Sequence, residues 1–218
     1  EVDGGKKNSL KEIRESPIAV EKKEVIRSRS FWLIGAVSAV NSLLITGLVF
    51  HQTNILGEVG YSEAKSAAMF LPQALGAVFG GFLFGWLADR KYRSYLPAII
   101  MLLLFLASGT VGYFSNNIFI LSYAFTLGLC LGGGTAVNSS LIPFLFGVSH
   151  VGSIFGILTF IMVLSSSVGA VFLALGEELF GSYREAILLA SLMPLALSII
   201  AMLIKPIKIK EETIGNLS

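Results

Sequence analysis

The stretch SYLPAIIMLLLFLASGTVGYF, residues 94–114, opens a run from residue 94 to residue 176 that contains no Asp, Glu, Lys or Arg. Charged side chains supply most of the exposed shell that keeps a soluble domain in water. A run of this length without any of them cannot cover an aqueous surface. Residues 94–176 therefore predict burial in lipid, and they rule out a soluble globular enzyme.

The rest of the chain repeats this division between lipid and water. Of 218 residues, 54% are hydrophobic and only 14% are charged, whereas a soluble domain usually carries about 25% charged residues. Residues 1–30 hold 14 of the charges and residues 205–218 hold 5. We expect a charged cytoplasmic linker at 1–30, a transmembrane bundle at 31–204 and a cytoplasmic tail at 205–218. The net charge of +2 gives no reason to expect a nucleic-acid partner.

Apolar segments long enough to cross a bilayer follow one another along residues 31–204. A transmembrane helix needs about 20 apolar residues, and charges, proline or Gly/Asn/Ser clusters mark where a turn can separate two of them. This pattern predicts an all-α integral membrane protein with six transmembrane helices. They are expected at 31–52, 66–87, 95–113, 118–146, 152–175 and 185–204.

The basic residues predict the orientation of the bundle. Lys and Arg are retained on the cytoplasmic side of a cell membrane. Fourteen of them lie in the two tails and the 90–93 turn, and only Lys65 and Arg184 lie on the opposite side. We therefore expect a multi-pass protein of the plasma or inner membrane with both termini in the cytoplasm.

Two short matches relate the first half of the bundle to the second. Residues 40–45 (VNSLLI) resemble residues 137–142 (VNSSLI), and residues 76–79 (GAVF) recur at 169–172. Transporters are often built from three-helix units repeated with inverted topology, which pair helix 1 with 4 and helix 2 with 5. The matches favour a 3+3 inverted repeat.

Uncharged polar residues within the predicted helices indicate an internal cavity. A polar group in hydrocarbon must find a partner or face water, so such residues usually point into the bundle. Hydrogen bonds between helices account for most Ser and Thr residues of this kind. We expect Asn41, Gln73, Asn138 and Ser166 to line a cavity for a small-molecule substrate.

The turn between predicted helices 2 and 3 reads GWLADRKYR, residues 85–93. It resembles the Gly-x-x-x-Asp-Arg-x-Gly-Arg-Arg loop of the major facilitator superfamily, with Tyr92 in place of the second glycine. An acid at a helix end can dock on the positive amino terminus of a neighbouring helix, and arginines can bind acidic or carbonyl partners. The resemblance implies a conformational latch made by Gly85, Asp89, Arg90 and Arg93.

A second stretch, FGVSHVGSIFG at residues 146–156, is similar to the loop between helices 10 and 11 of monocarboxylate-like members of that superfamily. The resemblance implies that the six helices are helices 7 to 12, the carboxyl-terminal half of a transporter. The partner is then a missing amino-terminal half of six helices. The first residue is Glu1 rather than methionine, which favours an excerpt of a longer chain.

The function implied is secondary transport of a small solute by alternating access between two bundles. The monocarboxylate-like branch implies an organic anion, although the helices carry no interior cation and a neutral solute fits equally. There are two alternatives: a half-size transporter that acts as a homodimer, and a membrane scaffold or partner subunit without transport. We expect no cofactor or metal, because His51 and His150 lie at opposite membrane faces and cannot share a metal ion. We expect no enzymatic activity, because residues 177–184 lack the Glu-Glu-x-x-x-Arg spacing of intramembrane proteases.

Overall fold

The computed structural model describes residues 22–90, 92–113, 116–147 and 151–204, and every regular element within these ranges is a helix. The expected all-α architecture is thus confirmed for the described part of the chain. Residues 1–21 of the expected linker and the whole expected tail lie outside it. The described part of the linker contains the short helix α2 (Lys22–Arg27).

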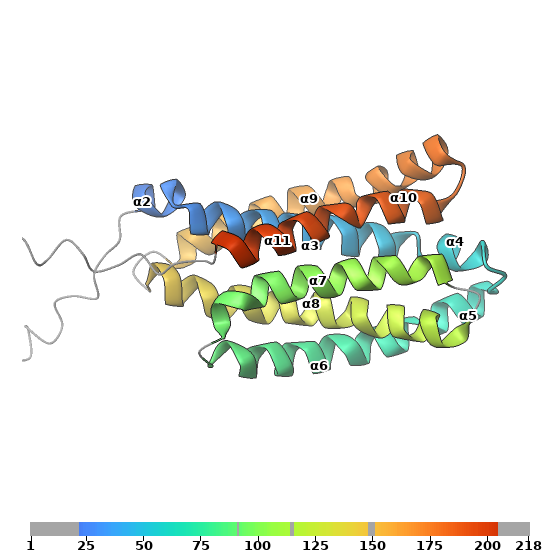
Figure 1. The fold of residues 1–218 in the computed structure, drawn as a ribbon, viewed down its shortest axis with the longest axis horizontal. Helices are drawn as coiled ribbons and strands as arrows, with labels where there is room; N and C mark the ends of the chain where they lie inside the picture. The colour runs from blue at the N-terminus through green and yellow to red at the C-terminus, as the bar shows by residue number, and fades with distance from the viewer. Residues whose placement is uncertain (1–21, 91, 114–115, 148–150, 205–218) are drawn as a thin grey trace, which may run out of the picture.

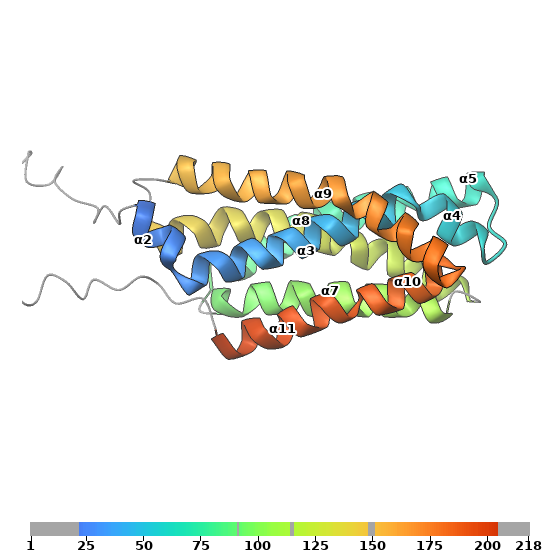
Figure 2. The same ribbon diagram turned by 90° about the horizontal axis from the view of Figure 1, so that it is seen from above.

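The longer helices run side by side as an elongated bundle (Figures 1 and 2). They are α3 (Arg29–Phe50), α6 (Phe70–Ala88), α7 (Leu96–Gly109), α8 (Asn117–Phe146), α9 (Val151–Phe180), α10 (Tyr183–Ala190) and α11 (Leu192–Ile204). Two short helices, α4 (Gln52–Gly57) and α5 (Glu63–Ala68), connect α3 to α6. In both views, α10 and α11 follow each other as one rod beside α7.

Five of the six predicted spans are long and apolar enough to cross a membrane. They are Arg29–Phe50, Glu63–Ala88, Asn117–Phe146, Val151–Phe180 and Tyr183–Ile204. The predicted third span contains a shorter apolar helix, Arg93–Gly109, because α7 is flanked by the tighter 3-10 turns η1 (Arg93–Tyr95) and η2 (Thr110–Tyr113). Large apolar side chains cover the outside of the bundle, and Phe82 on α6 is 78% exposed. Such a surface fits lipid, since soluble proteins rarely expose large apolar patches.

Local sequence explains where the long helices begin and end. Ser28 caps α3 by accepting a hydrogen bond from the Phe31 N–H at 3.1 Å, and the side chain of Asn116 caps α8 in the same way. Capping residues satisfy backbone donors that the first helical turn leaves without partners. Gly147 and Gly181 follow the ends of α8 and α9 with φ of +75° and +76°, a conformation that glycine adopts at little cost.

Glycines bring α6 and α8 into direct backbone contact. Gly76 and Gly80 on α6 lie against the backbone of α8, and Gly128 and Gly132 on α8 lie against the backbone of α6. At each of these four positions an added Cβ atom would collide with a backbone carbonyl of the opposite helix. In lipid, where burial gives no hydrophobic gain between helices, this close approach is what holds two helices together. The α6–α8 pair has the most extensive contact in the bundle.

The other extensive contact joins α3 to α9, and it is also made through glycine. Gly47 on α3 faces the carbonyl of Gly169, and Gly169 on α9 faces the carbonyl of Leu43. The predicted helices 1, 2, 4 and 5 are α3, α6, α8 and α9. A repeat that pairs helix 1 with 4 and helix 2 with 5 relates α3 to α8 and α9 to α6, so it relates the α3–α9 contact to the α8–α6 contact. The contact pattern is therefore compatible with a 3+3 repeat.

The structure separates the two sequence matches that motivated this repeat. The GAVF match is structural, because Gly76 faces the carbonyl of Phe125 just as Gly169 faces that of Leu43. Leu43 then corresponds to Phe125, 82 residues later, whereas the VNS segments are 97 residues apart. The mismatch of 15 residues corresponds to about 22 Å along a helix. The VNS segments thus do not occupy equivalent positions in these two helix pairs.

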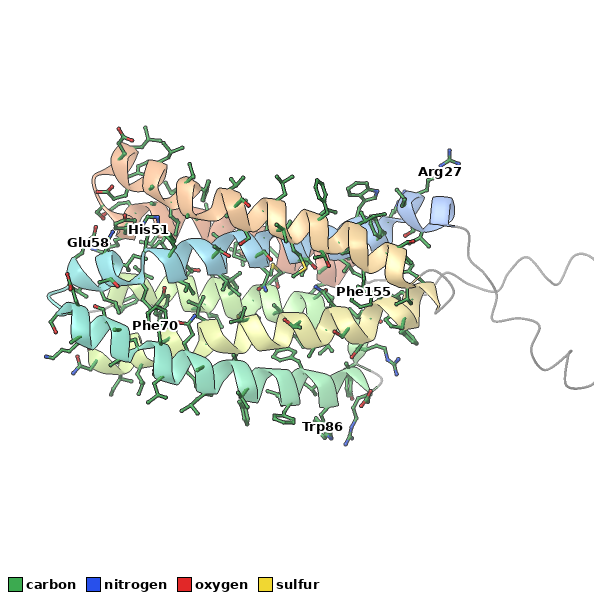
Figure 3. All side chains as sticks on the ribbon, turned by 180° about the vertical axis from the view of Figure 1, so that it is seen from behind. Arg27, His51, Glu58, Phe70, Trp86 and Phe155 are labelled. Atoms are coloured by element: carbon green, nitrogen blue, oxygen red, sulfur yellow. The ribbon has the colours of Figure 1, made fainter. Side chains whose placement is uncertain are left out.

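A polar network, in which His51 and Tyr183 are buried and Glu58 is exposed, joins the end of α3 to α9 and α10. It lies at the end of the bundle opposite Arg27, where His51 and Glu58 are found (Figure 3). His51 Nε2 is 2.9 Å from the carbonyl oxygen of Ala170, and Nδ1 is 3.0 Å from the Tyr183 hydroxyl. Because a carbonyl can only accept, Nε2 carries a proton and donates a hydrogen bond to Ala170. Glu58 accepts the Tyr183 N–H at 3.0 Å. The network fixes the start of α10 against α3.

Candidate functional site

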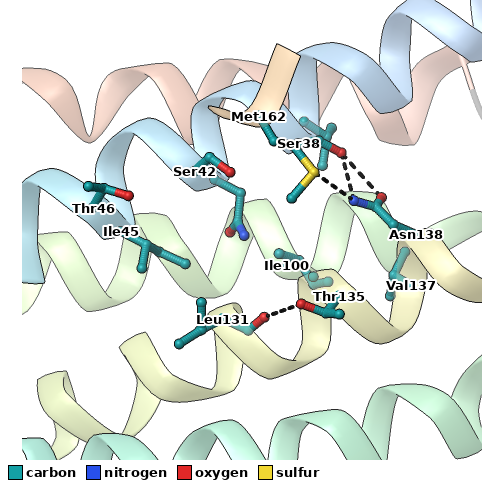
Figure 4. A pocket seen from close by; sticks show the side chains of 13 residues that line it. Ser38, Ser42, Ile45, Thr46, Ile100, Leu131, Thr135, Val137, Asn138 and Met162 are labelled. Atoms are coloured by element: carbon teal, nitrogen blue, oxygen red, sulfur yellow. Dashed lines mark hydrogen bonds between the residues drawn. The ribbon is translucent and has the colours of Figure 1, made fainter. Parts of the chain in front are cut away.

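A cavity of about 90 Å³ lies between α3, α7, α8 and α9, at mid-length of α3 (Figure 4). A water molecule needs at least about 10–15 Å³ of such space, so the cavity has room for several. None of its lining residues is charged. The lining consists of Val37, Ser38, Asn41, Ser42, Ile45, Thr46, Ile100, Leu131, Gly134, Thr135, Val137, Asn138 and Met162. Within the described residues, no three His, Cys, Asp or Glu side chains gather as metal ligands would.

Asn138 contributes an amide that is already paired. Its Nδ2 donates to Ser38 Oγ at 2.9 Å, and the Ser38 hydroxyl is 3.2 Å from Asn138 Oδ1. The same Nδ2 also lies 3.8 Å from Met162 Sδ (Figure 4). These contacts join α3, α8 and α9 along one wall of the cavity. Asn138 therefore holds the wall together as well as lining it.

Asn41 contributes an amide that is only half paired. Its Nδ2 donates a long hydrogen bond, 3.4 Å, to the backbone carbonyl of Cys130 on α8. Its Oδ1 is buried and has no partner, and the side chain is 8% exposed. Asn41 lines the cavity, and Oδ1 is its amide atom that can still accept a hydrogen bond.

Ser166 lies in a neighbouring, more open recess of about 500 Å³ between α3 and α9. Its hydroxyl is 2.8 Å from that of Thr46, and either oxygen can donate. Ser42, Thr46 and Met162 line both hollows, so the recess adjoins the cavity. The structure thus brings Asn41, Asn138 and Ser166 to one polar side of the bundle.

Gln73 does not share this position, which corrects the expectation that all four residues line one cavity. It lies on α6, where its backbone carbonyl meets Gly128 of α8, and it lines neither hollow. Its side chain is 5% exposed, and the buried Oε1 has no hydrogen-bond partner. The glycine contacts between α6 and α8 bring the two backbones together at this position.

The structure adds further lining residues that the sequence did not indicate, and three examples come from α7, α9 and α8. Ile100 comes from α7, Met162 from α9 and Gly134 from α8. Ile100 and Met162 lie within uninterrupted apolar runs, where no signal distinguishes a cavity wall from a lipid contact. Gly134 belongs to the glycine triplet at 132–134, a pattern that is typical of close helix packing but does not name the partner helix.

The four latch residues lie together at the end of α6, but their contacts differ. Asp89 follows α6 and is exposed, and the structure places no ion pair on it within the described residues. Arg90 stacks on the Trp86 ring at 4.1 Å, and Arg93 on the Phe144 ring at 4.0 Å. A Cβ added at Gly85 would meet open space, so close packing within this bundle does not require a glycine there.

Comparisons with known proteins give one match. The chain is 31% identical over 116 residues to the niacin transporter NiaP of Acinetobacter baylyi (strain ATCC 33305 / BD413 / ADP1). The matched residues are 51% of this chain and 25% of that protein, so the chain covers about a quarter of its length. No family model matches the chain. Together with the apolar helices, the likeness supports a multi-pass membrane protein of the transporter kind.

Proposed function

We propose that this chain is part of a secondary transporter and that a small solute passes through the cavity between α3, α7, α8 and α9. The observation that carries the proposal is an uncharged polar cavity at mid-length of an apolar bundle. Polar groups at this depth are costly in lipid, and transporters place their substrate sites near the middle of the membrane. The likeness to a niacin transporter supports the same function.

A second bundle of six helices completes the site in this proposal. Ser42, Thr46 and Ser166 line a recess that is open on the side of the bundle. Hydroxyl groups facing lipid have no outside partner, whereas a facing bundle gives them one. We assign the chain to the carboxyl-terminal half of a major-facilitator-type transporter of the monocarboxylate-like branch. The loop at residues 85–93 supports the superfamily, and alternating access then follows from rocking of the two halves.

The solute in this proposal is a small organic acid or its neutral relative. Niacin, the solute named for the similar protein, is an aromatic carboxylic acid. The cavity lining has no cation to pair with a carboxylate. A cation for that group must come from the second bundle, and this chain supplies uncharged contacts.

Uptake measurements test the transport function. Vesicles containing the protein in its natural full length should accumulate labelled nicotinate, and Asn138→Leu should lower the rate several-fold. Phe82→Leu on the exposed face of α6 serves as the matched control and should leave uptake unchanged. Absence of uptake, or equal rates in both variants, would contradict the proposal. The 218-residue chain alone should not accumulate solute, since the lining of its cavity carries no ionisable group that could couple to protons. Accumulation by that chain would favour the half-size homodimer.

Membrane orientation is tested by labelling. Both termini are cytoplasmic in this proposal, because 14 basic residues lie on one side and 2 on the other. Cysteines placed at Asn116 and Gly181 should react with an impermeant reagent added outside intact cells. Cysteines at Lys91 and Ser149 should react only after the membrane is opened. The reverse pattern would overturn the orientation.

A further inference from the structure

We infer that Asn41 determines specificity in this cavity: its side-chain carbonyl oxygen receives an N–H or O–H donor from the solute. The α3 side of the site then takes an uncharged, hydrogen-bond-donating group such as a carboxamide. A carboxylate at the same place is disfavoured. The inference rests on the proposed function and names the chemical group that this chain recognises.

Two residues of α8 fix the direction of the Asn41 amide. Nδ2 lies 3.4 Å from the carbonyl oxygen of Cys130. A rotated amide would place Oδ1 against that oxygen, and two acceptors without a hydrogen between them repel each other. Gly134 leaves the space for this arrangement, because a Cβ atom there would lie 2.7 Å from Asn41 Nδ2. The pairing therefore leaves Oδ1, and not Nδ2, as the amide atom without a hydrogen-bond partner beside the cavity.

Most of the neighbouring polar groups of the cavity already have partners, and the half-buried Ser42 is the exception. Ser38 pairs with Asn138, and the Thr135 hydroxyl donates to the carbonyl of Leu131 at 3.2 Å. Thr46 pairs with Ser166 outside the cavity. Among the buried side-chain atoms of the described residues that line this cavity, Asn41 Oδ1 is the one without a hydrogen-bond partner.

An acceptor buried without a partner costs free energy, which a donor from the solute can restore. A neutral carboxamide has such a donor in its NH₂ group. A carboxylate has only acceptor oxygens, and its negative charge would face the partial negative charge of Oδ1. An acceptor at the Asn41 position therefore favours an amide over the corresponding acid.

Nicotinamide and nicotinate form a matched pair of probes, since they share one ring and differ in this group. Equilibrium binding of each is measured at pH 7 with the full-length protein in lipid nanodiscs. Asn41→Leu keeps the side-chain size and removes the acceptor. It should weaken nicotinamide binding about fivefold and change nicotinate binding less than about twofold. Gly134→Ala keeps the amide but displaces it, and it should weaken nicotinamide selectively as well.

Gln73→Leu is the control, because it removes another buried amide with an unpartnered oxygen from outside the cavity. It should leave both affinities unchanged. Equal weakening of both probes by Asn41→Leu and Gly134→Ala, or no effect of either variant, overturns the inference. Failure of the wild-type protein to bind either probe also overturns it. Selective binding without uptake would instead keep the inference and remove the transport function, so the two failures are distinguishable.

Discussion

The α6–α8 interface and the α3 side of the bundle both use small residues, yet one is closed and the other holds a cavity. Four glycines between α6 and α8 bring the two backbones into contact. On α3, the small residues Ser38, Ser42 and Thr46 carry hydroxyl groups that pair across helices or line the open space. In lipid, glycine therefore closes an interface, whereas hydroxyl residues keep a polar space within it.

The largest effect should come from a methyl group added to the closed side. Gly132→Ala places a Cβ atom against the carbonyl of Ala77 on α6, and neither helix backbone can yield without moving the pair apart. We expect a loss of about 1–3 kcal/mol in the free energy of unfolding. Reversible unfolding in mixed detergent measures it.

Gly81→Ala is the matched control for this substitution, since a Cβ atom there meets nothing within 4 Å. It should be neutral or stabilising by up to about 1 kcal/mol, because alanine favours the helix over glycine. Equal losses in the two variants would show that glycine contacts do not hold α6 to α8.

The two glycine motifs of α6 also show what the sequence could not decide. Residues 76–80 and 81–85 of α6 carry the same Gly-x-x-x-Gly spacing. They are five residues apart, which rotates them by about 140° around the helix, so only one pair can face α8. Gly76 and Gly80 meet α8, while Gly81 and Gly85 face open space. Spacing predicts that a glycine face exists, and the position of the partner helix decides which face packs.

Asp89, the acid of the proposed latch, lies at the end of the closed α6–α8 interface. Asp89 follows α6, which α8 holds rigidly, so a contact made by Asp89 acts on both helices together. Asp89→Asn in the full-length protein should shift the ratio of inward-open to outward-open states several-fold. The reason is that the carboxylate charge is lost that can dock on the positive amino terminus of a neighbouring helix. State-specific accessibility labelling measures this ratio.

The intrinsic substrate affinity of each state should stay unchanged in the same Asp89→Asn variant. Arg27→Gln, a charge removed from α2 at the same end of the bundle, is the control and should leave the ratio as it is. A collapse of binding with an unshifted ratio would instead place Asp89 in the substrate site.

On the open side, the hydrogen bond between Ser38 and Asn138 should make a smaller contribution. Its geometry is good, at 2.9 Å, but the pair lies beside a cavity where water can replace either partner. A double-mutant cycle with Ser38→Ala and Asn138→Leu should give a coupling of about 0.6 kcal/mol, the average for such bonds between membrane helices. A coupling near zero would mean that hydroxyl pairs do not stabilise the open side.

The sequence predicted the polar side of the bundle better than the cavity itself. Asn41 and Asn138 were expected to line one site because amides in apolar helices need partners, and the structure brings them together. The same argument included Gln73, since hydrogen-bonding capacity does not reveal which helix covers a residue. The glycines opposite Gln73 carry that information, but only after α6 and α8 are known to be neighbours.

The smallest effect should come from Gln73→Leu, and it is the sharpest test of the difference between the two sides. Gln73 Oε1 is buried at the closed interface without a hydrogen-bond partner, so the amide already bears the cost of that unmade bond. Leucine has a similar volume and no polar atom, and the backbone carbonyl that meets Gly128 is unchanged by the substitution. The free energy of unfolding should therefore change by less than about 0.5 kcal/mol, or rise. Asn138→Leu, which breaks paired contacts on the open side, should cost more in the same assay. If the two substitutions are equally destabilising, the closed side contains a polar interaction of its own, and glycine contact alone does not account for it.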